Sequence, residues 1–177
     1  MQYNISNLAC SFTGHRPQRL GFGFDESDER CLALNSVLRK EIDKLVSVGV
    51  TSFYTGMALG VDQWAASVVL DIKEMNPNIK LTAVVPHEGQ SNNWTTEQRE
   101  RYRDMLSACD NMVMFFRGYT PSYMFERNRY LVDRADYLLA VYDGKENGGT
   151  AYTVGYAKEK HKRVIIIDPR CVGGTAR

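Results

Sequence analysis

The sequence lacks a strong excess of charge of either sign. Its 22 lysine and arginine residues are matched by 21 aspartate and glutamate residues, which leaves a formal net charge of +1. A near-neutral chain has no long-range basic field that would attract nucleic acid or an anionic membrane. The composition therefore argues against nucleic acid as a partner, although it leaves a local basic patch open.

Long apolar segments are also missing. No run approaches the roughly 18 residues that a membrane-spanning helix needs. Residues 1–8 are polar and lack the basic-then-apolar pattern of a secretory signal. Apolar residues make up 44% of the chain and charged residues 24%, which is ordinary for a soluble globular protein. We expect a cytoplasmic protein with no membrane partner.

Cysteine is scarce, with four residues at Cys10, Cys31, Cys109 and Cys171. None belongs to a C-x-x-C pair, and no cysteine–histidine cluster has the spacing of zinc ligands, so we expect no metal site. The even count is compatible with two disulfides, but reduced and mostly buried thiols are favoured in a cytosolic protein.

Several common catalytic and phosphate-binding motifs are absent. The chain holds no G-x-G-x-x-G fingerprint, and Gly60 is followed by Val61 and Asp62 rather than by the Lys-Ser/Thr of a Walker A loop. It also lacks a G-x-S-x-G elbow, which argues against a hydrolase triad of that kind.

What the sequence does contain is a regular alternation of short apolar runs and longer amphipathic stretches. Strands separated by helices form βαβ units, which build a parallel sheet with right-handed crossovers. The 177 residues therefore predict a single α/β domain over 1–177 with a mainly parallel sheet of about six strands. The pattern predicts strands at 8–13, 51–55, 79–85, 111–116, 136–142 and 163–167, and helices that begin near Ser27, Val61, Thr95, Ser122 and Gly149.

Ligands of open parallel sheets bind outside the carboxyl ends of the strands, so the residues that follow each strand are the candidate site. Most of these positions are glycine, threonine, histidine or charged residues, and a basic residue and an amide precede the fifth strand. The candidates are Thr13, Gly14, His15, Arg16, Thr55, Gly56, Met57, Gly60, Asp62, His87, Glu88, Arg127, Asn128, Tyr142, Gly148, Gly149 and Thr150.

The segment from Gly56 to Asp62 is the strongest of these features. Glycines permit positive φ and close backbone approach, and the helix that follows Gly60 presents free N–H groups, which together make an anion cradle. A plain strand-to-helix turn is the equally open alternative. Asp62 either satisfies the helix dipole or binds a ribose hydroxyl, a base edge or a proton in transit.

A second glycine-rich helix start lies at Gly148, Gly149 and Thr150. Two such starts on one sheet edge could grip one polyanionic ligand from both sides. Arg127 either binds phosphate or is a solvated surface arginine. Asn128 is either a structural clamp on a neighbouring loop or a ligand contact.

His15 and His87 each follow a strand end, so they could converge as ligand contacts or acid/base groups. If the protein is an enzyme, the acid/base candidates are Asp62, Glu88 and His87. The residues leave open whether any reaction is catalysed.

The two glycine-rich segments together resemble a known superfamily. Residues 55–62, which read TGMALGVD, are similar to the SG-x-A-x-GID segment of DprA proteins. Residues 125–129, which read FERNR, and the later GGT at 148–150 resemble the RRNR-to-GGS/T segment of the same proteins. DprA belongs to the SLOG superfamily, as do the LOG phosphoribohydrolases. The residues TGHRP at 13–17 and the short length look most like the small stand-alone YpsA-like branch.

This resemblance implies a Rossmann-like three-layer sandwich and a site for nucleotides or nucleotide-derived ligands. Two departures restrict what else it implies. LOG enzymes carry an active-site glutamate where this chain has Thr153, which argues against the phosphoribohydrolase reaction. DprA proteins bind single-stranded DNA through basic surfaces, and this chain lacks a strong positive balance.

Three functions follow, in order of preference. The first is the binding or sensing of a nucleoside phosphate or an ADP-ribose-like ligand, with no further cofactor required. The second is cleavage of an N-glycosidic or phosphate-ester bond of a nucleotide. The third is single-stranded nucleic-acid binding through Arg117, Arg127, Arg129 and Trp94. Helix faces with Tyr102 and Met105, or with Tyr119 and Tyr123, are candidates for packing against a second copy in a homo-oligomer.

Overall fold

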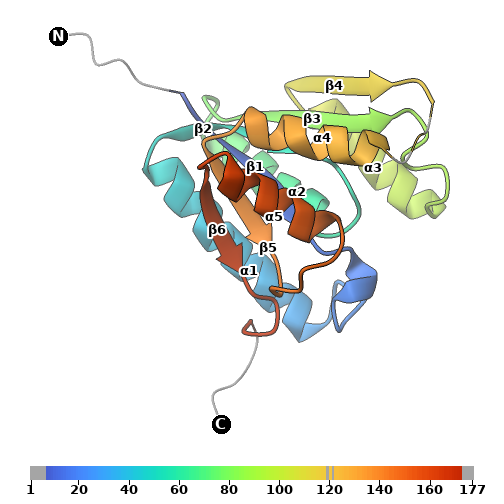
Figure 1. Ribbon diagram of the computed structural model, residues 1–177, viewed down its shortest axis with the longest axis horizontal. Helices are drawn as coiled ribbons and strands as arrows, with labels where there is room; N and C mark the ends of the chain where they lie inside the picture. Colours follow the sequence, from blue (N-terminus) through green and yellow to red (C-terminus); the bar gives the residue numbers. More distant parts are fainter. Residues whose placement is uncertain (1–6, 119, 121, 173–177) are drawn as a thin grey trace.

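The computed structural model describes residues 7–118, 120 and 122–172, and within them strands and helices alternate along the chain (Figure 1). The strands are β1 Leu8–Gly14, β2 Val50–Thr55, β3 Lys80–His87, β4 Asn111–Phe116, β5 Tyr137–Val141 and β6 Arg163–Ile167. The helices are α1 Glu29–Ser47, α2 Val61–Met75, α3 Thr96–Ala108, α4 Ser122–Asp133 and α5 Gly149–Glu159, with a short 3-10 turn, η1, at Pro17–Arg19.

The strands form one sheet in the order β4-β3-β2-β1-β5-β6, and every neighbouring pair is parallel. The chain moves outward from β1 to β4 and then returns to the other side of β1, so the order reverses between β1 and β5. Right-handed crossovers in opposite directions put their helices on opposite faces. Accordingly, α2 packs on α1 and α3, whereas α4 packs on α5 (Figure 1). The predicted Rossmann-like three-layer fold is confirmed.

The hydrophobic core lies between the sheet and its helices. The continuous apolar run in β3 is covered on both faces, with Leu81, Ala83 and Val84 all buried. In β6 the same kind of run behaves differently, because Ile166 is 46% exposed. β6 is an edge strand, so a continuous apolar run there did not guarantee cover on both faces.

Most element boundaries lie within one residue of those expected, and two of the differences have a clear structural cause. β3 does not stop at Pro86 but continues to His87. Beyond Ala83, β3 pairs with β4 and no longer with β2, so the missing N–H of proline removes no bond on that side. The first helix is capped by Asp28, whose side chain accepts from the Arg30 amide at 2.8 Å, rather than by Ser27.

The helix face expected to meet a second copy is used within the chain instead. Tyr102 and Met105 are buried in the core, which corrects that expectation. Tyr123 stacks on Phe116, with 3.5 Å between ring centroids. Tyr119 lies outside the described residues.

All four cysteines are free thiols, and Cys10 and Cys31 are buried, as the preferred interpretation of the sequence had it. Across the described residues, no helix has both the length and the apolar character needed to cross a bilayer.

Candidate functional site

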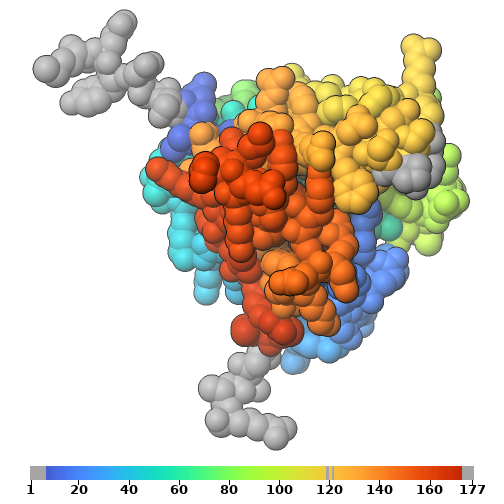
Figure 2. Space-filling view, in the orientation of Figure 1, coloured from blue at the N-terminus to red at the C-terminus, as the bar shows by residue number. Residues whose placement is uncertain are grey.

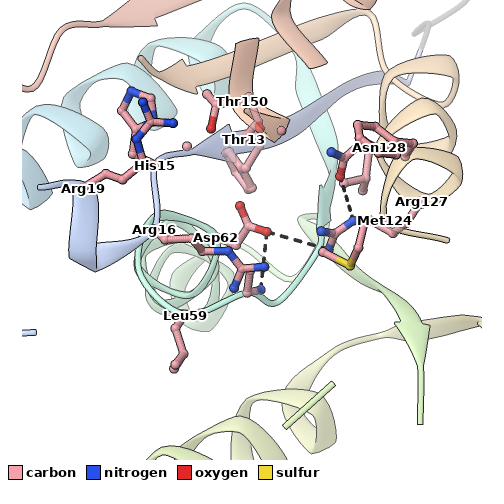
Figure 3. Close-up of a pocket in the computed structure, with 16 residues that line it drawn as sticks. Thr13, His15, Arg16, Arg19, Leu59, Asp62, Met124, Arg127, Asn128 and Thr150 are labelled. Atoms are coloured by element: carbon pink, nitrogen blue, oxygen red, sulfur yellow. Dashed lines mark hydrogen bonds and ion pairs between the residues drawn. The ribbon is translucent and has the colours of Figure 1, made fainter. Parts of the chain in front are cut away.

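A cavity of about 370 Å³ opens at the carboxyl ends of the strands, beside the point where the sheet order reverses. In the space-filling view, α4 and α5 cover the sheet on this side (Figure 2). The cavity combines side chains of the loop after β1, such as His15 and Arg16, with residues from α2, α4 and α5 (Figure 3). Its lining consists of Phe12, Thr13, Gly14, His15, Arg16, Arg19, Ala58, Leu59, Asp62, Met124, Phe125, Arg127, Asn128, Leu131, Gly149 and Thr150.

The loop from Thr55 to Asp62 is held by its own side chains. The Thr55 hydroxyl donates to the Asp62 carbonyl at 3.0 Å and accepts from the Met57 amide at 3.1 Å. Gly60 has a φ of +91°, a conformation that residues with a side chain rarely adopt. A β-carbon at this position would come within 2.9 Å of Pro17. The glycine is therefore required both by the turn and by close packing.

Asp62 is buried at the start of α2, and its carboxylate faces the cavity. One oxygen, Oδ2, accepts from the Ala58 amide at 3.4 Å. The other oxygen accepts no hydrogen bond from the part of the chain that the structure describes, and it points into the cavity on the side of Thr13 and Thr150 (Figure 3). Burial raises the pKa of Asp62, and the nearby Arg127 and Arg16 oppose that rise.

Arg127 lies on α4 and is also buried. The expectation that it is a solvated surface arginine is therefore wrong. Its Nη1 donates to the Gly56 carbonyl at 2.7 Å, and its Nε donates to the Asn128 side-chain oxygen at 2.9 Å. The same Nη1 lies 4.0 Å from Asp62 Oδ2. Burial lowers the pKa of Arg127, and Asp62 opposes that change. Arg127 therefore holds the loop between β2 and α2 in place and lies close enough to Asp62 to act as its counter-charge.

The first turn of α5 opens into the cavity without a side-chain cap. Gly148 precedes it at φ +92°, and Gly149 and Thr150 line the cavity. Because the first amides of a helix have no partner within the helix, this end favours an anion. Thr153, which stands at the position of the LOG glutamate, donates instead to the Gly149 carbonyl at 2.8 Å and does not line the cavity.

His15 is buried where the loop after β1 meets the loop after β5. Its Nε2 lies 2.8 Å from Asp143 Oδ1 and 3.2 Å from the Asp143 amide, while its Nδ1 is buried without a partner. Burial acts to raise the pKa of Asp143, but hydrogen bonds from the Lys145 amide and from His15 outweigh it and hold that pKa at about 2. Tyr142 packs beside His15, with 5.8 Å between ring centroids.

The structure brings together most of the residues expected at the site. Other members of the expected set support the cavity from behind or flank it: Thr55, Gly56, Met57, Gly60, Tyr142 and Gly148. Those that line the cavity are Thr13, Gly14, His15, Arg16, Asp62, Arg127, Asn128, Gly149 and Thr150.

The three acid/base candidates do not meet. His87 and Glu88 line a separate, more open hollow of about 790 Å³ together with Arg117. Asp62 lies in the first cavity, so His87 does not converge there with His15 either.

Sequence reasoning missed several residues of the cavity. Arg19 lies in η1 and donates to the carbonyl and side-chain oxygens of Asn147 at 3.3 and 3.0 Å, which ties the first loop to the loop before α5. Nothing local in the sequence indicates that contact. Met124 and Phe125 complete the α4 side of the cavity. Met124 had a usable signal, because it precedes Leu131 by seven positions on one helical face.

These features define a Rossmann-like α/β protein with a cavity of polar and apolar side chains at the switch point of its sheet. Comparison with protein families gives a narrower assignment. The model of the YpsA family, described as the YspA SLOG family, matches residues 10–168. The chain belongs to this family of SLOG proteins.

Similar proteins agree with the family assignment. A UPF0398 protein of Shouchella clausii is 34% identical over 168 residues, which covers 93% of this chain and 89% of that protein. The UPF0398 protein YpsA of Bacillus subtilis is 26% identical over 155 residues and covers 86% of each chain.

Solved structures show the same fold at low identity. DprA of Streptococcus pneumoniae superposes with a TM-score of 0.62 at 15% identity. That match covers 93% of this chain but only 51% of the DprA chain. DprA of Helicobacter pylori, a structure described for its single-stranded DNA binding mode, gives a TM-score of 0.59 at 16% identity and is covered to 65%.

Proposed function

We propose that the cavity beside the start of α5 binds a nucleotide-derived ligand, such as a nucleoside phosphate or an ADP-ribose-like molecule. One observation carries the proposal. The uncapped first turn at Gly149 and Thr150 and the unbonded carboxylate oxygen of Asp62 open into the same cavity. The free amides of the first turn can donate to a phosphate, and the carboxylate oxygen of Asp62 can accept a hydrogen bond from a ribose hydroxyl.

The charges around the cavity support the same assignment. Arg16 and Arg19 line it and are exposed at its mouth, and neither has a carboxylate in hydrogen-bond contact. Two guanidinium groups that no carboxylate of the described residues neutralises, next to a helix N-terminus, favour a phosphate. Asp62 would repel a phosphate placed against it, so the phosphate lies toward α5 and the sugar toward Asp62.

The remaining lining suits the apolar part of such a ligand. Met124 and Phe125 form one side of the cavity and Leu59 another. Phe125 is 44% exposed and offers a ring face on which a base can stack. The volume of about 370 Å³ lies within the range of about 300–1,000 Å³ that is usual for small-molecule sites.

A thermal-shift screen against nucleotides, ADP-ribose, NAD and cyclic nucleotides tests the proposal. A ligand at about 100 times its dissociation constant adds roughly 2.7 kcal/mol of stability. Gly149→Glu should abolish the shift, because it places a carboxylate at the start of α5. Gly155→Glu is the matched control, since it adds the same charge on the exposed face of the same helix. A shift that survives Gly149→Glu, or the absence of any shift, would contradict the proposal.

Product analysis of the protein–ligand mixture from the thermal-shift screen tests whether the protein is an enzyme. Among its acid/base candidates, Asp62 alone lies in the cavity. A turnover that depends on Asp62→Asn would establish an enzyme acting through this residue. Unchanged ligand after long incubation would leave binding as the function.

Single-stranded nucleic-acid binding is a second candidate that one surface feature favours. The Arg129 guanidinium lies 5.7 Å from the ring centroids of both Tyr152 and Tyr156, and Phe125 at the cavity rim packs edge-on against Tyr152. Aromatic and arginine groups of this kind can stack on unpaired bases. The net charge argues against nucleic acid only for the surface as a whole, so a local patch here stays open.

This candidate keeps Arg129 but loses two other residues expected to contribute. Arg127 is buried, and Trp94 packs edge-on against Tyr102 with 5.1 Å between centroids. Fluorescence anisotropy with a labelled oligothymidine measures the interaction. Binding that weakens steeply with salt and is reduced by Arg129→Ala supports this candidate, and salt-independent or absent binding removes it.

A further inference from the structure

A second hollow, of about 420 Å³, lies next to the cavity at the carboxyl ends of β1, β5 and β6. Four cationic side chains from separate segments line it, namely Arg19, Arg30, Lys145 and Arg170, together with one acid, Asp143, which lies 3.4 Å from Lys145 Nζ. None of the residues expected from the sequence to bind ligand lies there except His15. The hollow is therefore a separate feature that the proposed function has not used.

The two outer arginines of this hollow are held in place by carboxylates beside them. Arg30 donates to Asp28 from Nε and Nη2 at 2.9 and 2.7 Å, and Arg170 Nε donates to Asp168 at 2.9 Å. Side chains that are already ordered lose less rotamer freedom when they bind a ligand. Arg19 is paired with no acid of the described residues, and its guanidinium donates to the two oxygens of Asn147.

The two hollows share a wall made of His15 and Arg19, which line both of them. His15 is 2% exposed, and its Nδ1 is buried without a hydrogen-bond partner. A buried ring nitrogen with no partner among the described residues is costly, and a ligand atom can supply that partner. This wall lies where the sheet order reverses between β1 and β5, which is the point where ligands cross the edge of open α/β sheets.

We propose that the ligand has two parts and occupies both hollows. It is a dinucleotide joined through phosphates, with one nucleoside in the first cavity and the other in the second hollow. The linking phosphates cross the shared wall beside Arg19 and the start of α5. Phe22 lines the second hollow half-buried, with its ring centroid 5.9 Å from that of Trp64 and 6.0 Å from the Arg30 guanidinium, so the second base would meet the guanidinium that lies over this ring. This inference rests on the proposed function of the first cavity.

Calorimetric titration of the purified protein with AMP, ADP and NAD tests the inference. Wild-type protein should bind NAD at least ten times more tightly than AMP. Arg30→Ala and Arg170→Ala should each weaken NAD binding severalfold and leave AMP binding unchanged. Arg39→Ala is the matched control, because Arg39 also pairs with an aspartate, Asp43 at 3.2 Å, but lies away from both hollows.

The results separate this inference from the function on which it rests. Binding of AMP with no gain for NAD, or equal NAD binding in wild type, Arg30→Ala and Arg170→Ala, would overturn the two-part ligand alone. Binding of no nucleotide at all would overturn the proposed function and this inference with it. The melting temperatures of the unliganded variants show whether each remains folded, as expected for the exposed side chains of Arg30 and Arg170.

Discussion

The guanidinium of Arg127 lies 4.0 Å from the carboxylate of Asp62, and both side chains are buried in the wall of the cavity. The same guanidinium donates to the Gly56 carbonyl at 2.7 Å. One side chain of α4 therefore holds the turn between β2 and α2 and also faces the acid that this turn presents. The shape of the cavity and the charge of Asp62 depend on a contact between segments far apart in the sequence.

Replacing Arg127 with methionine should destabilise the fold strongly. The substitution keeps most of the side-chain volume but leaves Asp62 without its buried counter-charge and the Gly56 carbonyl without its donor. Removing one partner of a buried pair costs about 3–5 kcal/mol. Urea unfolding monitored by circular dichroism measures the loss. Arg103→Met, at an exposed position on α3, should change stability by less than about 0.5 kcal/mol. Equal stability of the two variants would contradict the structural role given to Arg127.

Two glycine-to-alanine substitutions should act in opposite directions. A β-carbon at Gly56 would lie 1.8 Å from Arg127 Nη1 and 2.7 Å from Asp62 Oδ2, so Gly56→Ala should destabilise the protein and displace the pair. Gly155, inside α5, has no atom within 4 Å of such a carbon. Gly155→Ala should therefore stabilise the protein by about 0.5–1 kcal/mol. Melting temperatures of both variants are the measurement, and a shared direction would be the contrary result.

Asp62→Asn should weaken ligand binding, and because it also leaves Arg127 without its buried counter-charge, affinity is compared only at a temperature where the melting curve shows the variant folded. The amide has nearly the same shape, but it no longer offers a charged acceptor to a ribose hydroxyl. A hydrogen bond to a charged group contributes about 1.5–3 kcal/mol, so affinity should fall tenfold or more. Asp71→Asn, on the exposed side of the same helix, is the matched control and should bind as wild type does. Calorimetric titration with the best ligand of the screen measures both, and unchanged affinity in Asp62→Asn would remove this residue from the site.

Asp110 should make stability depend on pH in the acid range. Burial acts to raise its pKa, but hydrogen bonds from Lys73, the Leu81 amide and Lys80 outweigh burial and hold the pKa at about 2. In an unfolded chain an aspartate titrates near pH ~3.9. A depressed folded-state pKa means that the contribution is complete above that value and is lost as the pH falls toward about 2.

Asp110→Asn removes this contribution at neutral pH. The variant should be less stable than wild type at pH 7, by at most about 2.6 kcal/mol and by less after solvent screening. The two proteins should converge as the pH falls from about 4 to about 2. Urea midpoints across this range provide the test, and a constant gap down to the lowest pH would contradict the assignment.

The fold could be predicted from the sequence because periodicity is local. The helix start expected near Thr95 is confirmed, and Thr95 forms a capping box there with Gln98. The boundary at Pro86 was wrong, because whether a proline ends a strand depends on which neighbour still pairs there. That information lies in the register of β2 and β3, which the sequence of one strand does not carry.

The site could be predicted in part, because some of its signals are local in the sequence. The glycine-rich starts of α2 and α5 carry local signals, and the topology then brings them to one edge of the sheet. The burial of Arg127 and the bridge from Arg19 to Asn147 arise from packing between distant segments. The separation of His87 from Asp62 likewise depends on where the loop after β3 folds, which no spacing along the chain indicates.

Amide mapping by nuclear magnetic resonance tests the central claim most directly. Isotope-labelled protein would be titrated with the nucleotide that gives the largest thermal shift, and the displaced amide signals would be assigned. A nucleotide bound in the cavity should move the Gly149 and Thr150 amides most, followed by those of Gly14 and Ala58. Displacements confined to the hollow of His87 and Glu88, or no displacement at a saturating concentration, would contradict a nucleotide site at the start of α5.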